Sequence, residues 1–279
     1  MKNIKLIATD LDGTFLRNDK SISEKNLNAL DYLGARKVVR VVATGRNLRK
    51  VNEVIPEEVP FDYIVFSSGA GVYDRISGKH IFSRNISGET STKLIKFLIS
   101  CDLNFHAFHP VPENDHLWYH RGSEPCSEFE RYFSFHNSYA SPLPENGEAA
   151  SGLCQFLVVI PGDEKRFLSM KSEIESQFPE IRVIRSSSPL ETGYIWLEIF
   201  HREVSKGNGV LHLCDGLGIS PAETLGVGND YNDLDLLEFT GHSFLTDNAP
   251  DVLKDSFMLV PTNEEDAFAH IVEKLEWES

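Results

Sequence analysis

The stretch from Leu6 to Thr14 is an apolar run that stops at two carboxylates, a glycine and a hydroxyl. Such a run is typical of a buried strand in a parallel sheet, and open α/β sheets bind ligands just beyond the carboxyl ends of their strands. Asp10 and Asp12 would then share one crowded site, in which two carboxylates cannot both stay ionised at low cost. We therefore expect a cation to join them, or one of them to hold a proton. A strand followed by an ordinary Asp-Gly turn is the simpler interpretation that this stretch alone leaves open.

Both ends of the chain alternate between strand and helix patterns. Ser21-Ile22-Ser23-Glu24 fits a capping box at the start of a helix. The β-branched run 38–43 predicts a second strand, which ends in Thr44-Gly45-Arg46. Residues Glu264 to Trp277 are expected to form a closing helix. Strands that alternate with helices in this way predict an α/β fold with a Rossmann-like parallel sheet.

The pattern changes in the middle of the chain. Residues 84–200 contain several strand-like runs and helices without regular alternation, so we expect a separate α+β domain there. That domain would be inserted between two segments of one core, residues 1–83 and 201–279. The stretch 138–152 is rich in Pro, Gly, Ser and Glu and is expected to be a loop.

Composition excludes some classes of partner. The 279-residue chain has a formal net charge of −15, which argues against nucleic acid and against an anionic membrane surface. An anionic substrate would need local cations or a metal ion to reverse this field. The four cysteines show no zinc-ligand spacing, so we interpret them as buried, reduced thiols of a cytoplasmic protein. No segment has the length and hydrophobicity of a membrane span.

Three further polar segments accompany the first. They are Thr44-Gly45-Arg46, Ser205-Lys206-Gly207 and Gly228-Asn229-Asp230-Tyr231-Asn232-Asp233. Together with Asp10 to Thr14, and in this order, they resemble the haloacid dehalogenase superfamily of phosphohydrolases. The long insert resembles its Cof-type sugar-phosphatase branch, and the resemblance covers essentially the whole chain. It implies a Rossmann-like core with an inserted α+β cap that closes over the active site and sets substrate specificity.

The resemblance also implies roles for single residues. Asp10 would be the nucleophile that forms an aspartyl phosphate, and Asp12 would protonate the leaving group and later take a proton from water. The groups expected to bind the phosphate are Thr44, Gly45, Lys206 and Asn232. In isolation, the two polar segments around Thr44 and Lys206 are equally well explained as a strand-end turn and a solvated lysine. Arg46 has an open alternative too, because it would also suit a structural ion pair with a nearby acid.

A hard divalent cation, Mg²⁺, is the expected cofactor, because the segments offer oxygen ligands only. The resemblance implies Asp10, the backbone carbonyl of Asp12, Asn229 and Asp233 as the metal-binding residues. The usual family pattern, Gly-Asp-x-x-Asn-Asp, has an acid where this chain has Asn229. An amide oxygen can coordinate a cation but adds no charge, so either Mg²⁺ affinity falls or Asp230 restores the charge.

The expected function is hydrolysis of a small phosphorylated metabolite, with a sugar phosphate as the favoured substrate. A phosphomutase or phosphonate-cleaving enzyme on the same fold, and a sugar-phosphate-binding regulator without turnover, are the alternatives. Ser68 stands where this branch often has Asn, which would affect substrate contacts. His106, His109, His116 and His120 suggest a sugar-binding patch or a second metal site in the cap, but scattered surface histidines are the favoured explanation. The sequence assigns no oligomeric state.

Overall fold

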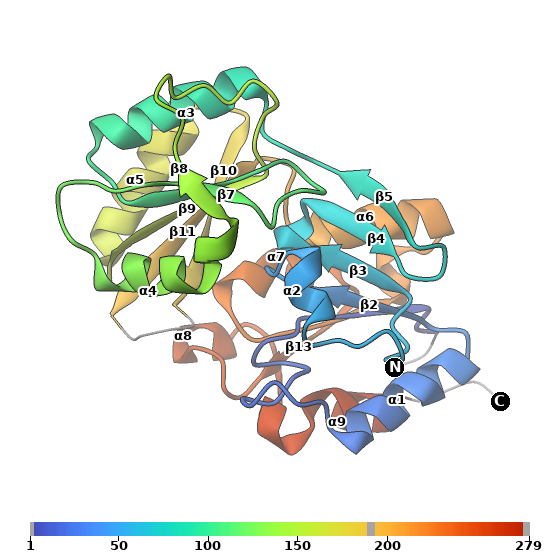
Figure 1. The fold of residues 1–279 in the computed structure, drawn as a ribbon. Helices are drawn as coiled ribbons and strands as arrows, with labels where there is room; N and C mark the ends of the chain where they lie inside the picture. The colour runs from blue at the N-terminus through green and yellow to red at the C-terminus, as the bar shows by residue number, and fades with distance from the viewer. Residues whose placement is uncertain (1–2, 189–192, 276–279) are drawn as a thin grey trace. The chain divides into compact units, whose positions relative to one another are not determined.

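The computed structural model describes residues 3–188 and 193–275. Within them the chain forms two compact units, each built on one sheet (Figure 1). The first unit comprises the residues up to Phe82 and from Ser205 onward, and the second runs from Ser83 to Val204. The predicted α/β fold class is confirmed. None of the helices in these described ranges is long and apolar enough to cross a membrane.

The sheet of the first unit has the order β14-β13-β12-β1-β2-β3-β4-β5. Its strands are β1 (Leu6–Thr9), β2 (Val39–Ala43), β3 (Tyr63–Phe66), β4 (Gly71–Asp74), β5 (Lys79–Ser83), β12 (Thr224–Gly228), β13 (His242–Thr246) and β14 (Met258–Val260). All pairs from β14 to β3 are parallel, and β4 is antiparallel to β3. From β1 the chain builds the sheet first toward β3 and later, through β12, toward β14. The strand order therefore reverses beside β1, which is where ligands bind in open sheets.

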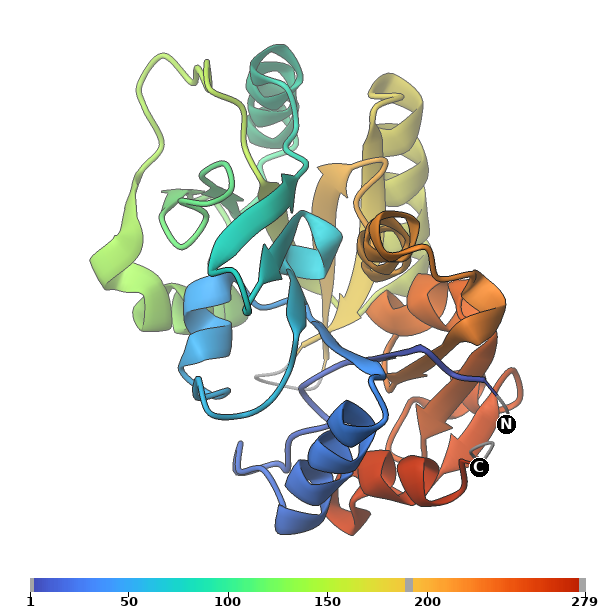
Figure 2. The ribbon, with the colours of Figure 1, turned by 90° about the vertical axis from the view of Figure 1, so that its right-hand side faces the viewer.

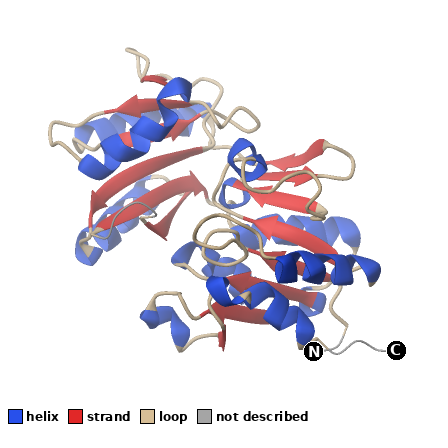
Figure 3. Cartoon of the chain, turned by 60° about the horizontal axis from the view of Figure 1, so that its bottom comes forward, coloured by secondary structure: helices blue, strands red, loops and turns tan. Residues whose placement is uncertain are grey.

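Helices lie on both faces of this sheet (Figure 3). They are α1 (Glu24–Ala35), α2 (Leu48–Asn52), α6 (Lys206–Leu217), α7 (Leu234–Phe239), α8 (Asp251–Lys254) and α9 (Ala267–Glu273), with short 3₁₀ turns η1 (Ser67–Gly69), η3 (Pro221–Glu223), η4 (Tyr231–Asp233) and η5 (Asn263–Glu265). Helix α1 packs beside α9, as Figure 2 shows in blue and red, and α6 packs beside α7. Val210 and Leu213 of α6 join Leu6 of β1 in a buried cluster, so α6 is held against the centre of the sheet.

Two predicted helix ends are wrong. Helix α1 is capped by Ser23, whose side chain accepts from the Asn26 N–H, so the capping box predicted from Ser21 does not form. The closing helix is interrupted at Asp266, where φ is 60°. The Asp266 carboxylate pairs there with Arg17 at 3.1 Å, a contact that the local pattern does not reveal. Trp277, the predicted end of that helix, lies outside the described residues.

The second unit has a six-stranded sheet of order β10-β11-β9-β6-β7-β8. Its elements are α3 (Gly88–Ser100), β6 (Phe105–Phe108), β7 (Leu117–His120), α4 (Ser127–His136), η2 (Asn137–Tyr139), β8 (Ala140–Pro142), β9 (Gln155–Pro161), α5 (Glu164–Gln177), β10 (Ile181–Ser187) and β11 (Tyr194–His201). Its pairs are antiparallel except β7 with β8. Strand β8 corrects the prediction that 138–152 is entirely loop.

Helices α3 and α5 and helix α4 contact different faces of this second sheet. Leu94 of α3 and Phe167 of α5 join the apolar core with Phe105 of β6. His106, the next residue in β6, points to the other face because side chains alternate along a strand. There its ring stacks on Phe129 of α4, with 4.2 Å between ring centroids.

The four histidines of the predicted patch do not form one surface. His106 is fully buried, and His120 stacks on Phe105, a core side chain of the opposite face. The rings of His109 and His116 are 6.1 Å apart. Within the described ranges, no group of three or more His, Cys, Asp or Glu side chains is arranged to hold a metal ion. The prediction of one patch of four histidines is therefore wrong, and the alternative of scattered surface histidines is wrong for the buried His106.

The cysteines form no disulfide, but they are not all buried. Cys154 and Cys214 are buried, whereas Cys126 is half-buried and Cys101 is exposed. Cys101 follows the last turn of α3, where the chain leaves the core of the second unit. The prediction of four buried thiols therefore holds for two of them.

His106 makes the stability of the second unit depend on pH. Burial lowers the pKa of His106 to about 3 from 6.5, and neither ring nitrogen has a hydrogen-bond partner within the described residues. The unfolded chain therefore binds a proton that the folded chain does not. We expect the free energy of unfolding to fall by about 2 kcal/mol between pH 7 and pH 5 through this residue. His106→Leu should remove this slope in urea denaturation, while the control His116→Leu at an exposed site should keep it. Equal slopes in wild type and His106→Leu would contradict the assignment.

Gly69 sets how closely α6 approaches η1. Its φ is +98°, and a Cβ there would lie 2.0 Å from the Ser205 carbonyl oxygen, which is rigid backbone. We expect Gly69→Ala to cost more than about 3 kcal/mol of unfolding free energy. Gly218→Ala is the matched control, because Gly218 also has positive φ but no described atom lies within 4 Å of the added Cβ. That variant should lose only about 1 kcal/mol, and comparable losses in the two variants would contradict the packing argument.

Candidate active site

The predicted polar residues lie where neighbouring strands end. Asp10 directly follows β1, Thr44 follows β2, and Asn229 follows β12. Thr9, the last residue of β1, is in register with Val42 of β2 and Val227 of β12. Because the strands are parallel, their ends meet at one edge of the sheet.

Lys206 brings two of these strand ends together. Its side chain is 1% exposed, and Nζ donates to Asp10 Oδ1 at 2.7 Å and to Asp233 Oδ1 at 2.6 Å. Nζ also lies 3.4 Å from Asn232 Oδ1. The N-terminus of α6 is fixed by Ser205, whose side chain accepts from the Asn208 N–H. One buried ammonium group therefore joins β1, α6 and the segment after β12.

The charge state of this group follows from burial. Burial raises the pKa of Asp10 above the usual aspartate value, and the nearby carboxylates of Asp233 and Asp12 add to the rise, although Lys206 opposes it. Burial alone would lower the pKa of Lys206, but the two carboxylates raise it above its usual value. Lys206 is therefore charged. Within the described chain no group hydrogen-bonds to Asp10 Oδ2, so this oxygen is the one left for chemistry.

Asp12 is held by two other cations. Arg46 donates from Nε to Asp12 Oδ2 at 2.6 Å and from Nη2 to Oδ1 at 2.8 Å, and Lys20 Nζ lies 2.7 Å from Oδ1. Burial alone would raise the pKa of Asp12, but the hydrogen bonds and charges of Arg46 and Lys20 lower it to about 2. Asp12 is therefore ionised at neutral pH. Arg46 thus forms the structural ion pair with a nearby acid that was its alternative role.

Asn229 sits against the loop that follows Asp12. Its Oδ1 accepts from the Thr14 hydroxyl at 3.0 Å, and a Cβ on Gly13 would lie 2.6 Å from Asn229 Nδ2. Behind it, Asp233 Oδ2 accepts from the backbone N–H groups of Asn229 at 2.8 Å and Asp230 at 3.0 Å. Asp233 thus orders the whole segment after β12 as well as pairing with Lys206.

The remaining predicted phosphate ligands face one another. A Cβ on Gly45 would lie 3.5 Å from Ser68 Oγ and 3.8 Å from Asn232 Nδ2. Thr44 Oγ1 accepts from the Arg46 N–H at 3.2 Å. No described group accepts from the Thr44 hydroxyl, so its proton is available to a bound anion.

Other residues of this edge were not predicted. Lys20 has no motif around it, and only the folded loop brings it to Asp12. Ser67 and Ser68 both have positive φ, at 48° and 54°, in the turn after β3. Left-handed residues other than glycine are uncommon and cluster at functional sites, but the sequence of this turn gives no such signal.

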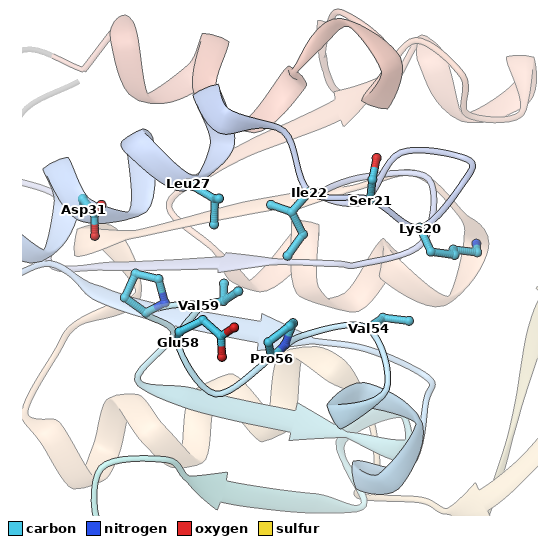
Figure 4. A pocket seen from close by; sticks show the side chains of 10 residues that line it. Lys20, Ser21, Ile22, Leu27, Asp31, Val54, Pro56, Glu58 and Val59 are labelled. Atoms are coloured by element: carbon cyan, nitrogen blue, oxygen red, sulfur yellow. The ribbon is translucent and has the colours of Figure 1, made fainter.

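A separate hollow lies on the same unit. It has a volume of about 490 Å³ and is lined by Lys20, Ser21, Ile22, Leu27, Asp31, Val54, Pro56, Glu58, Val59 and Pro60 (Figure 4). Its walls are the segment 20–31 and the loop 54–60, and most of its lining is apolar. None of the acidic strand-end residues lines it, but Lys20, which contacts Asp12, does, so the hollow borders the candidate active site without containing it.

The oxygen donors of the site suit a hard cation. They are the carboxylate of Asp10, the amide oxygen of Asn229 and the backbone carbonyl of Asp12, with no cysteine or histidine among them. The Asn229 amide oxygen has two lone pairs, and Thr14 uses one of them. Such a mixed oxygen set fits Mg²⁺ better than zinc.

Comparison with known proteins identifies the family. Residues 7–272 match the family model described as haloacid dehalogenase-like hydrolase. The 5-amino-6-(5-phospho-D-ribitylamino)uracil phosphatase YwtE of Bacillus subtilis is 24% identical over 297 residues, covering 98% of each chain. The HMP-PP phosphatase of Klebsiella pneumoniae is 23% identical over 251 residues, covering 90% of this chain and 86% of that protein. The HAD subclass IIB sugar phosphatase BT4131 has the same fold, with a TM-score of 0.75 at 16% identity over 96% of this chain and 98% of that one.

Removing the Lys206 charge should strongly destabilise the first unit. Lys206→Met leaves Asp10 and Asp233 buried without a counter-charge, so we expect a loss of about 3–5 kcal/mol in the free energy of unfolding. Adding Asp10→Asn should restore part of it. The matched control is Lys254→Met, which breaks ion pairs with Asp247 and Asp251 at the surface. That control should cost less than about 1 kcal/mol. Urea denaturation measures all three, and equal losses for the two lysines would refute the buried-charge argument.

Proposed function

The chain belongs to the haloacid dehalogenase-like hydrolases and is a phosphatase of that family, and we propose that it hydrolyses a small phosphomonoester through a phosphorylated Asp10. The observation that carries this proposal is the contact of buried Lys206 with both Asp10 and Asp233. It gathers a nucleophile, a fixed positive charge and the segment after β12 at one sheet edge. A sugar phosphate or a related polyol phosphate is the favoured substrate class.

The first half-reaction uses Asp10 and Asp12. Asp10 Oδ2 forms a bond to phosphorus while the bond from phosphorus to the ester oxygen breaks, and the leaving alkoxide receives a proton from Asp12. Asp12 is ionised in the ligand-free protein, so it must gain that proton before the ester bond breaks. Arg46 holds both of its oxygens and orients it for the transfer.

The second half-reaction reverses the role of Asp12. Its carboxylate takes a proton from water, the water oxygen attacks phosphorus, and the bond to Asp10 breaks to release inorganic phosphate. The Thr44 hydroxyl, the Gly45 N–H, Lys206 and Asn232 would bind the phosphate oxygens and stabilise the charge that spreads over them.

Asp10, the Asp12 carbonyl and Asn229 would hold Mg²⁺, with Asp233 ordering the backbone behind them. When bound, the cation would neutralise negative charge on the Asp10 carboxylate and on the phosphoryl oxygens. All of these residues belong to the first unit. We therefore assign the chemistry to that unit and substrate selection to residues 83–204.

The test is phosphate release from a panel of sugar, polyol and heterocyclic phosphomonoesters, with and without Mg²⁺. We expect Mg²⁺-dependent release by the wild type and a loss on the order of 10³-fold or more in kcat for Asp10→Asn. Asp31→Asn, at an exposed position of α1, is the control and should keep full activity. No release from any ester by a folded protein that binds inorganic phosphate would contradict the proposal and favour a sugar-phosphate sensor.

A further inference from the structure

Apart from Asp230, whose side chain caps η4, the charged side chains of the candidate active site carry no net formal charge. Its three carboxylates, Asp10, Asp12 and Asp233, contact three cationic side chains. Lys206 pairs with Asp10 and Asp233, and Arg46 and Lys20 both pair with Asp12. The site is thus balanced before a metal ion or a phosphoryl group enters it.

Asn229 keeps the charges of the site equal in number because it is uncharged where the family pattern has an acid. Its backbone N–H donates to Asp233, and its side chain is held by Thr14 and packs on Gly13. An aspartate in this place has the same shape and would accept the same hydrogen bond from Thr14. It would add one negative charge beside the other metal donors.

A divalent cation that enters a neutral site gains little from it beyond what water provides. A phosphate dianion likewise gains little binding free energy from a site without net positive charge. Each of them supplies the charge that the other needs. We propose that Mg²⁺ and the phosphoryl group bind this site as a pair, each weakly alone, and that Asn229 causes this mutual dependence. The inference rests on the proposed function and specifies how its cofactor and substrate are bound.

Asp230 is the residue that could instead supply the missing charge. It is half-buried, it follows Asn229 directly, and its backbone N–H also donates to Asp233 Oδ2. If its carboxylate served the metal ion, the site would carry a net negative charge and would bind the cation alone. Asp230→Asn removes the Asp230 charge and leaves Asn229 unchanged. It therefore distinguishes a metal site that uses the Asp230 carboxylate from one that does not.

The experiment measures binding rather than turnover. Isothermal titration calorimetry gives the affinity for Mg²⁺ with and without saturating inorganic phosphate, in the wild type, Asn229→Asp and Asp230→Asn. We expect phosphate to tighten Mg²⁺ binding by the wild type roughly tenfold or more. Asn229→Asp should bind Mg²⁺ alone roughly tenfold more tightly than the wild type and show a smaller effect of phosphate. Asp230→Asn should behave as the wild type does.

A reciprocal titration tests the pairing in the wild type alone. Binding linkage requires Mg²⁺ to tighten phosphate binding by the same factor as phosphate tightens Mg²⁺ binding. This arm remains decisive if Asn229→Asp does not fold. Equal Mg²⁺ affinities with and without phosphate would overturn the inference, as would a loss of Mg²⁺ binding in Asp230→Asn. Either result would leave the phosphatase assignment intact, whereas Mg²⁺-independent release in the assay above would overturn the proposed function instead.

Discussion

The buried ammonium group of Lys206 is the contact on which the rest of the site depends. It is 1% exposed and lies between two carboxylates from segments more than two hundred residues apart in the chain. A buried charge without its partner costs several kcal/mol, so these three side chains are stable only together. Because β1, α6 and the segment after β12 each carry one of them, the sheet edge cannot assemble without also assembling the site. Folding of the first unit therefore also assembles the candidate active site.

Close backbone packing makes that contact reachable. Gly69 allows the turn after β3 to touch the Ser205 carbonyl, and a Cβ on Gly207 would lie 2.4 Å from the Asp235 carbonyl oxygen. The first turn of α6 is therefore pressed against both the turn after β3 and α7. A lysine at the start of a helix usually extends into water, but here the neighbouring segments leave its side chain no exposed path. The packing of neighbouring segments, more than the position of Lys206 in α6, determines that its ammonium group contacts the carboxylates.

Residues close in sequence were easier to predict than contacts between distant ones. The apolar run before Asp10 and the β-branched run before Thr44 correctly predicted parallel strands, because burial on both faces leaves a local pattern. The order of the polar segments predicted the family, which the comparison confirms. Lys20 was missed, since nothing in its neighbours indicates a partner eight residues back at Asp12. His106 was misplaced for the same reason, because its burial depends on α4 and not on its own strand.

The roles of the single site residues remain predictions. The electrostatics show that only charges close to the sheet edge can act strongly on a bound phosphate. The chain carries a net charge of −15, which repels a phosphate approaching from solution. Exposed charges are screened beyond roughly 10 Å at moderate salt, so most of these acids act weakly at the sheet edge. Lys206 is buried and therefore barely screened, and Arg46 is only 22% exposed. The sheltered carboxylates of Asp10, Asp12 and Asp233 offset these cations. A phosphate at this sheet edge therefore meets much less repulsion than the net charge of the whole chain suggests. A lysine occupies the core because its charge cancels carboxylates that are buried beside it.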